Sequence, residues 1–290
     1  MQFTHNIFQG ALLAALVSSV AGHTDVTSVQ IGGKTYKGFY AASKASCATD
    51  SPAWCTNQGW GHQPVMGDKI NHPDIIAHKD ASPSSFTAEA PAGSKVSFTW
   101  FHTGDCAAGN EVGWDCSHHG WSSAWLASCN GDCSKVDKTQ LSFFKIHESG
   151  LLGYPAGTRY ADGSSKEQTG KWATDVIFYD NKNVDTITLP KDIPSGNYVL
   201  RTELTSIHNN GDVSERQFWP QAFNIKVTGG SDSAKVPAGV KGTEIYKTTD
   251  PLLTFNLYQH VAGATYATVS SPKIASVAST SKRSHARDFA

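Results

Sequence analysis

The chain has 290 residues, a formal net charge of -1 and a pI near 6.9, and 17% of its residues are charged. This near-neutral balance gives no electrostatic support for binding to nucleic acid or to an anionic membrane, so we expect neither partner. The 8 Trp, 9 Tyr and 13 Phe residues suit an uncharged partner better.

The first 22 residues predict a secretory signal peptide. An apolar run over residues 7–20 is too short to cross a bilayer comfortably, and small residues follow it. Two cleavage positions fit the pattern: one leaves Gly22 as the first residue and the other leaves His23, and the pattern alone slightly favours the first. No other long apolar run exists in the sequence, so we expect a secreted, extracellular protein without a membrane span.

The following segments predict a β-rich domain. The alternation of Val96, Phe98 and Trp100 in KVSFTWF is the period-2 pattern of a half-buried strand. Further strands are predicted in DVIFYD, DTITLP, NYVLRTEL and QAFNIKVTG, at residues 175–180, 185–190, 197–204 and 221–229. We predict an all-β fold, an immunoglobulin/fibronectin-like antiparallel β-sandwich, with long loops at 42–72 and 102–121.

The sequence divides into three parts. After the signal peptide (1–22), residues 23–273 are expected to form a single catalytic-type β-sandwich domain. The segment 229–236 is typical of a linker, but residues 244–266 beyond it are apolar and aromatic enough to pack back on the body. Residues 274–290 are Ser/Ala-rich and basic, and we expect them to be a disordered tail.

The cysteine content predicts disulfide bonds. Six cysteines, an even number in a secreted context, all lie after the signal peptide. Fifteen connectivities are possible, and the order along the chain favours three local pairs: Cys47–Cys55, Cys106–Cys116 and Cys129–Cys133.

Three places combine metal-capable and aromatic side chains: the possible amino terminus at His23, the DCSHHGW loop with His118 and His119, and the segment with His208, Gln217 and Trp219. An α-amino group has a pKa near 8, so it can bind metal at neutral pH, and the amine and ring of one histidine can close a chelate. A second imidazole would complete a T-shaped set of three nitrogens, which suits Cu(II). Taken singly, each residue also has a structural reading: a surface histidine, a core tryptophan or a solvated glutamine.

Seven motifs then follow in order along the chain: GHT at the signal junction, HPDIIAHKDASPSSFTAEAPAGSKVSFTW, SHHG, WLASCNGDCSKVDKTQLSFFKIHESGL, ITLPKDIPSGNYVLRTELTSIHNNG, QFWPQAFNIKVTGG and YKTTDPLLTFNLYQ. Together they make the sequence resemble fungal lytic polysaccharide monooxygenases of auxiliary activity family 9, formerly glycoside hydrolase family 61. The resemblance covers roughly residues 23–270 and implies a β-sandwich fold.

The resemblance also implies a site. It places signal cleavage after Gly22 and implies one copper ion held by the amine and ring of His23 and by the ring of His118. His119 falls on a position that the family leaves variable, so it is not expected to bind the metal. His208 and Gln217 match the outer-shell pair that hydrogen-bonds the oxygen species beside the metal.

The activity implied by the resemblance is oxidative cleavage of cellulose or a related β-glucan. It requires an external electron donor and O₂ or H₂O₂, and we expect the protein to act as a monomer. Tyr258 and Tyr266 are candidates for stacking on the polysaccharide, although burial in the core is an equally good interpretation of each.

The chain departs from the family pattern in three places. Trp219 stands where the family usually has a tyrosine that presents its phenol to the axial position of copper, so Trp219 is expected to form an apolar or π wall there. Ala77 and Ala222 replace a pair of cysteines that form a disulfide in the family, a loss of about 2–4 kcal/mol unless it is offset. Trp121 replaces a common proline at the end of the altered loop 102–121, so the face that meets the substrate is expected to differ from the family pattern.

Other functions remain open from the sequence. Trp219 favours a non-catalytic secreted copper-binding protein on the same fold. A plain carbohydrate-binding sandwich would bind glycan without copper. A two-carboxylate hydrolase is weaker, because no Asp or Glu stands in a recognisable context.

Overall fold

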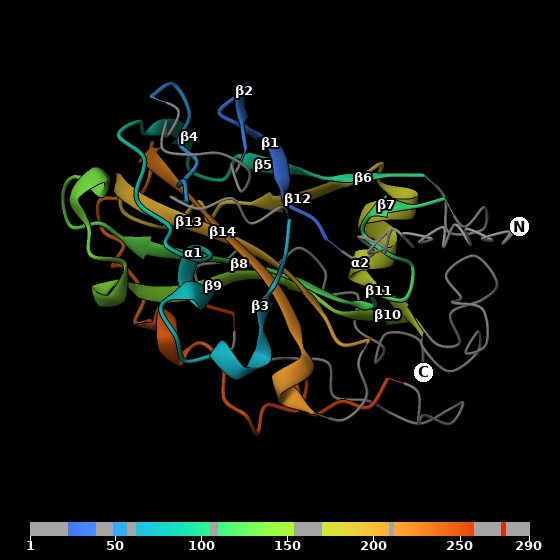
Figure 1. Ribbon diagram of the computed structural model, residues 1–290. Helices are drawn as coiled ribbons and strands as arrows, with labels where there is room; N and C mark the ends of the chain where they lie inside the picture. The colour runs from blue at the N-terminus through green and yellow to red at the C-terminus, as the bar shows by residue number, and fades with distance from the viewer. Residues whose placement is uncertain are drawn as a thin grey trace, which may run out of the picture.

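The protein is described by a computed structural model that covers residues 23–38, 49–56, 62–104, 110–153, 170–208, 212–257 and 274–276. Two β-sheets pack against each other, as Figure 1 shows. The smaller sheet has the order β12–β5–β1–β2 and contains β1 (Val26–Ile31), β2 (Lys34–Lys37), β5 (Lys95–Trp100) and β12 (Val184–Thr188). All of its strand pairs are antiparallel.

The larger sheet has the order β15–β9–β8–β13–β14–β3, and β4 pairs with β14 in parallel. Its strands are β3 (Val65–Met66), β4 (Ala88–Pro91), β8 (Gly120–Ser128), β9 (Ser142–Ser149), β13 (Gly196–Ser206), β14 (Gln217–Thr228) and β15 (Val240–Lys241). The long antiparallel ladder β8–β13–β14 is the centre of this sheet. The architecture confirms the predicted all-β sandwich.

Short elements gather at one end of the sandwich, on the right of Figure 1. They include the two hairpins β6 (His102–Thr103) with β7 (Val112–Gly113) and β10 (Leu151–Gly153) with β11 (Lys171–Trp172). The helices of the described residues are α1 (Asp74–Ala77), α2 (Ala173–Asp175), a π-helical turn (Val176–Asp180) and the 3₁₀ turns Gly67–Lys69, Cys133–Lys135, Lys138–Gln140, Val213–Glu215 and Gly242–Glu244.

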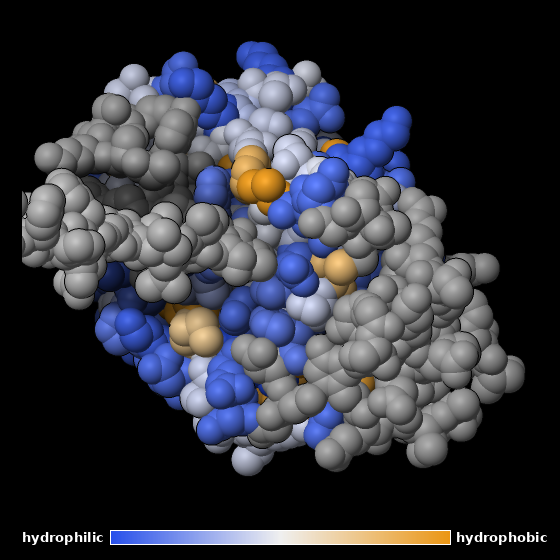
Figure 2. Space-filling model, turned by 45° about the vertical axis from the view of Figure 1, so that its right-hand side comes forward, coloured by the Kyte–Doolittle hydropathy of each residue, from blue (hydrophilic) through white to orange (hydrophobic). Residues whose placement is uncertain are grey.

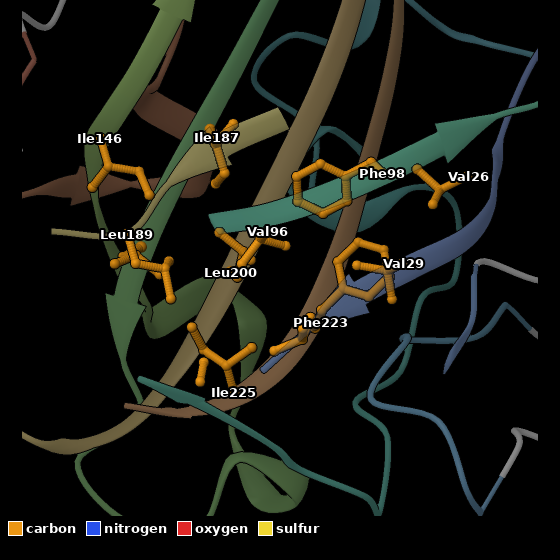
Figure 3. Packing of buried hydrophobic residues seen from close by; sticks show 14 of the residues in the cluster. Val26, Val29, Val96, Phe98, Ile146, Ile187, Leu189, Leu200, Phe223 and Ile225 are labelled. Carbon is orange, nitrogen blue, oxygen red and sulfur yellow. The ribbon is translucent and has the colours of Figure 1, made fainter. Parts of the chain in front are cut away.

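The main core lies between the two sheets. The alternating Val96, Phe98 and Trp100 of β5 point inward and are at most 1% exposed, as the period-2 pattern predicts. From the larger sheet, Phe223 meets Phe98 at a ring-centroid distance of 5.5 Å, and Leu200 packs in the same cluster. Figure 3 shows Val96, Phe98, Leu200 and Phe223 packed together between the sheets. Burial of such side chains contributes about 1.5–3 kcal/mol each.

A second core covers the outer face of the larger sheet. It contains residues of α1 and of the C-terminal segment, including Ile245, Tyr246, Leu252, Leu253 and Leu257, all 0–1% exposed. The larger sheet is therefore buried on both faces, which explains why β8 and β13 are buried almost without alternation. The prediction that the segment beyond residue 243 packs back on the body is confirmed for its described part, up to residue 257.

The two alanines that replace the family's cysteine pair lie in this second core. Ala77 in α1 and Ala222 in β14 are 0% and 1% exposed and belong to one apolar cluster, where α1 packs against β14. The backbone of Ala222 also accepts a hydrogen bond from the N–H of Trp54, a fully buried residue of the same cluster. Apolar packing thus fills both alanine positions.

The predicted strand over residues 175–180 is wrong, because this segment forms α2 and the π-helical turn instead. Asp175 starts the turn: its carboxylate accepts the backbone N–H of Trp172 at 2.6 Å. The consecutive residues Ile177 and Phe178 are both buried in the core. A strand would point these two side chains to opposite faces, whereas a helical turn directs both inward.

Disulfide bonds form as the cysteine count predicts. Cys129 and Cys133 are bonded to each other across a Cα–Cα distance of 5.2 Å. Cys55 and Cys116 are also disulfide-bonded, and their expected partners, Cys47 and Cys106, lie outside the described residues.

No helix among the described residues is long and apolar enough to cross a membrane. On the face that Figure 2 presents, the described residues form a mainly hydrophilic surface with small, separate apolar spots.

Within the expected tail, residues 274–276 contact β9, because the N–H of Ala275 donates to the carbonyl of Lys145 at 2.8 Å.

Acidification is expected to destabilise the fold through His78, which is 3% exposed. Its Nε2 lies 2.9 Å from the carbonyl oxygen of Gln63, and burial lowers the pKa of its ring from 6.5 to about 4. In the unfolded chain the ring of His78 is therefore protonated near pH 6.5, whereas in the folded protein it is protonated only near pH 4. Stability present above pH 6.5 is lost across this window, by about 3 kcal/mol for this residue.

Urea unfolding at pH 7 and pH 4 measures this loss. The variant His78→Gln keeps a donor for the carbonyl of Gln63 but has no titrating ring. Between pH 7 and pH 4, its free energy of unfolding should therefore fall by about 3 kcal/mol less than that of the parent. Equal pH dependence in the two proteins would contradict this account.

Candidate metal centre

His118 lies in a tight turn directly before β8. Its backbone N–H donates to the carbonyl of Asp115 at 2.9 Å, and the N–H of Ser117 donates to the Asp115 carboxylate at 2.8 Å. The Oγ of Ser117 lies 3.2 Å from Nδ1 of His118. The position of His118 is therefore set by its own loop and by β8, which begins two residues later. Burial, followed by the nearby ring of His208, holds the pKa of His118 well below its ordinary value.

His208 and Gln217 meet His118 from the ends of the neighbouring strands β13 and β14. The rings of His208 and His118 stack at a centroid distance of 3.8 Å and an interplanar angle of 18°. Nδ1 of His208 pairs with Oγ of Ser206 at 2.7 Å, and burial lowers the pKa of His208 to about 4. The Gln217 amide lies within hydrogen-bonding reach of the His118 ring, while its Oε1 is buried without a well-aligned hydrogen bond.

His23 approaches the same place from the start of β1. Its N–H donates to the carbonyl of Gly113 in β7 at 2.8 Å. The next two residues are fixed to the same hairpin, because Thr24 Oγ1 donates to the carbonyl of Phe101 and the Phe101 N–H donates to that of Asp25, both at 2.8 Å. His23 is close enough to contribute to the lowered pKa of His118.

Two tryptophans form the interior wall of this cluster. Trp219 and Trp114 are both 0% exposed, their rings lie 5.0 Å apart, and they lie 6.1 and 5.4 Å from the ring of His118. Nε1 of Trp219 donates to the backbone carbonyl of His62 at 2.9 Å. The one polar atom of the indole is thus bonded to a backbone carbonyl, so the remaining ring presents an apolar surface beside His118.

His119 faces away from the cluster. It is 0% exposed, and its Nδ1 lies 2.9 Å from the Asp175 carboxylate in α2. Consecutive residues at the start of a strand point to opposite sides, so only one of the two histidines can face the cluster. The structure thus brings together His23, His118, His208, Gln217 and Trp219 and leaves His119 in the interior.

The donor set is compatible with copper. Nδ1 of His23 is buried and has no hydrogen-bond partner among the described residues. Burial is the largest cause of the lowered pKa values of His23, His118 and His208, so all three rings are neutral at pH 7 and retain a nitrogen lone pair. Within the described ranges, no group of three or more His, Cys, Asp or Glu side chains forms a metal site. A site of two rings and one amine needs only two such side chains.

The sequence reasoning missed the contributions of Trp114 and Glu111. Trp114 is the second half of the wall, and Glu111 accepts hydrogen bonds from three segments around the site. The signal that could have pointed to them is their place in the long loop before His118, which the sequence marks as unusual. The two stacking candidates, Tyr258 and Tyr266, lie outside the described residues.

Replacing Trp219 tests the wall. In Trp219→Tyr, a phenol oxygen replaces the apolar ring beside His118, so the electron paramagnetic resonance spectrum of the protein loaded with copper would change. In Trp219→Phe the wall stays apolar, so the spectrum should stay close to that of the parent. Loss of the bond to the His62 carbonyl should lower the free energy of unfolding by about 1 kcal/mol. If the spectrum of Trp219→Tyr were identical to that of the parent, the role of Trp219 as an apolar wall of the copper site would be contradicted.

Known proteins resemble this chain in sequence and in fold. The sequence profile of "Auxiliary Activity family 9 (formerly GH61)" matches residues 23–266. The chain is 40% identical to AA9 family lytic polysaccharide monooxygenase AA17 of Aspergillus oryzae and 38% identical to AA9 family lytic polysaccharide monooxygenase B of Aspergillus fumigatus, in each case over 87% of this chain and 91% of the relative. Among solved structures, the extended catalytic domain of H. jecorina LPMO9A matches with a TM-score of 0.73 and 32% identity, over 89% of this chain and 93% of that one. Sequence and fold together show that the chain belongs to auxiliary activity family 9, the lytic polysaccharide monooxygenases.

Proposed function

We propose that the mature protein is a secreted, copper-dependent monooxygenase that cleaves cellulose or a related β-glucan. The observation that carries this proposal is the convergence of His23, His118, His208 and Gln217 over the wall of Trp114 and Trp219. Cleavage of the signal peptide after Gly22 would convert the backbone N–H of His23 into an amine. The start of the family match at His23 supports this cleavage site over the one before Gly22.

The residues divide the work by their chemistry. The amine and ring of His23 and the ring of His118 would hold one copper ion. Copper, when bound, supplies the redox chemistry by which O₂ with two electrons and two protons, or H₂O₂ alone, converts a C–H bond beside a glycosidic link to C–OH with release of water. Because the pKa of His208 is lowered to about 4, its ring is neutral at pH 7 and offers a hydrogen bond rather than a charge.

Gln217 and the two tryptophans define the surroundings. The Gln217 amide adds a second polar group beside the His118 ring, and its Oε1 needs a partner that the described residues do not supply. Trp114 and Trp219 keep water away from the interior side of His118, since both are fully buried. We expect the oxidant and the polysaccharide to approach from the side of His23 and His208, which are only partly buried.

The direct test uses swollen cellulose and the mature protein starting at His23. Soluble oligosaccharides with oxidised ends should appear, by mass spectrometry, only when copper and a reductant such as ascorbate are both present. Release of unoxidised ends without reductant would contradict the proposal and indicate hydrolysis. Glycan binding that survives copper removal, without any cleavage, would indicate a plain carbohydrate-binding module.

The second candidate is a non-catalytic copper-binding protein on the same fold. The observation that favours it is Trp219, whose N–H is used by His62 and which offers the metal no oxygen. Tight 1:1 copper binding together with no oxidised product on any glucan, and no peroxide formation with ascorbate, would select this candidate.

A further inference from the structure

Glu111 is a buried carboxylate that three separate segments use as a hydrogen-bond acceptor. Its side chain is 8% exposed. Its Oε1 accepts from Nε2 of His102 in β6 at 2.9 Å and from the hydroxyl of Tyr179 in the π-helical turn at 2.7 Å. Its Oε2 accepts from the backbone N–H of Cys116 at 2.9 Å. Both oxygens are therefore occupied by protein donors.

The segment that contains His102, strand β6, pairs with the strand that fixes the position of His23. Glu111 directly precedes β7, which pairs with β6 through His102 and Gly113. The carbonyl of Gly113 accepts the N–H of His23 at 2.8 Å. Gly113 has a φ of +103°, and a Cβ there would lie 2.7 Å from the carbonyl oxygen of Phe101, so the close approach of the two strands requires glycine.

The segment that contains Cys116 fixes the position of His118. Cys116 lies two residues before it, and the turn between them is closed by hydrogen bonds from the N–H groups of Ser117 and His118 to Asp115. A shift of the Cys116 N–H would therefore move the His118 backbone with it. The carboxylate of Glu111 is bonded to the hairpin that holds His23 and also to the loop that holds His118.

We propose that Glu111 is a positioning residue that sets the separation and relative orientation of His23 and His118. This role rests on the proposed function, since it matters only if these two histidines hold one copper ion. Glu111 touches neither ligand, and it acts through the backbone of Gly113 on one side and of Cys116 on the other.

The chemistry of the donors makes a sharp test available. Burial, reinforced by the adjacent Glu111 carboxylate, raises the pKa of the Tyr179 phenol, so its hydroxyl remains a donor, as does the backbone N–H of Cys116. These two donors lie on different oxygens of Glu111. In Glu111→Gln, the new NH₂ group has two possible orientations. Either it faces the Cys116 N–H, which cannot accept a hydrogen bond, or it faces Tyr179 and His102, whose hydroxyl must turn and whose ring must change tautomer in order to accept. In either orientation the bonds to the three segments lose the negative charge that strengthens them, although the side chain keeps its size.

The experiment measures Cu(II) affinity by competition with a chelator, and the electron paramagnetic resonance spectrum, on mature proteins starting at His23. Glu111→Gln is expected to weaken Cu(II) binding about 10–100-fold and to alter the copper hyperfine splitting, as loss of an outer-shell partner does. Glu89→Gln, a matched change of an exposed carboxylate in β4, should leave both unchanged. Circular dichroism and thermal unfolding of the copper-free proteins separate a folded variant from an unfolded one.

Glu111→Asp is the second variant, because it keeps the charge and both acceptor oxygens but is one methylene too short to reach all three donors. It should fold and weaken Cu(II) binding about tenfold, and it decides the matter if Glu111→Gln does not fold. Folded Glu111 variants with the affinity and spectrum of the parent would overturn the positioning role. If the parent itself binds Cu(II) no better than His118→Ala, the proposed function fails instead, so the two failures are distinguishable.

Discussion

Replacing His118 by alanine in the mature protein is expected to weaken Cu(II) binding more than about a hundredfold. Loss of an outer-shell partner costs 10–100-fold, and removal of a ligand itself must cost more. The ring of His118 is the one that faces His208, Gln217 and the tryptophan wall. Calorimetric titration with Cu(II) measures the affinity directly.

The matched control is the adjacent histidine. His119→Gln removes a buried ring whose Nδ1 contacts Asp175, so the variant should be less stable but should keep its copper affinity within about threefold. If the affinity were lost in His119→Gln and retained in His118→Ala, the copper ligand would be His119, and the assignment to His118 would be wrong.

Replacing Glu203 by alanine is expected to lower the free energy of unfolding by about 3–5 kcal/mol, because it leaves a buried charge without its partner. Glu203 is 0% exposed, pairs with Arg201 and accepts a hydrogen bond from the hydroxyl of Tyr246. Arg201 in turn donates to the carbonyls of Ile75 and Ile76 at 2.8 and 2.9 Å. This network fastens both α1 and the C-terminal segment to the larger sheet.

Urea denaturation compares the variants. Glu89→Ala, a change of an exposed carboxylate on β4, should alter the free energy of unfolding by no more than about 0.5 kcal/mol. Glu203→Gln keeps an acceptor for Tyr246 and should lose less than Glu203→Ala. A Glu203→Ala protein as stable as the Glu89→Ala control would show that the network does not hold the two layers together.

The fold could be predicted where side-chain alternation reports a half-buried strand. Val96, Phe98 and Trp100 gave the correct strand and the correct buried face. The pattern failed at residues 175–180, where two adjacent apolar residues and a run of aromatics have the composition of a strand. The Asp175 carboxylate closes a helical turn there through the Trp172 N–H, and that contact is not visible in local composition.

The site could be predicted only in part. The histidines, Gln217 and Trp219 came from resemblance to a family, because each residue alone has an ordinary structural explanation. The structure adds why His118 and not His119 faces the cluster: His119 points to Asp175 in α2, a contact 56 residues away along the chain. The role of Glu111 could not be predicted, since its three donors come from three segments that only the folded chain brings together.

The loss of the family's cysteine pair also shows where sequence reasoning holds. Paired replacement at Ala77 and Ala222 predicts that the two positions lie together, and both are buried in the one cluster where α1 meets β14. The buried Arg201–Glu203 network that secures α1 could not be predicted from the sequence, because it depends on the register of β13.

The central claim is that a free amine on His23 and the ring of His118 hold one copper ion together. The most direct measurement is a Cu(II) titration of two proteins whose first residues are verified by mass spectrometry, one starting at His23 and one retaining Gly22. The account predicts one tightly bound Cu(II) per chain in the first protein and a large loss of affinity in the second, whose His23 nitrogen is an amide. Equal affinity in the two proteins would contradict it.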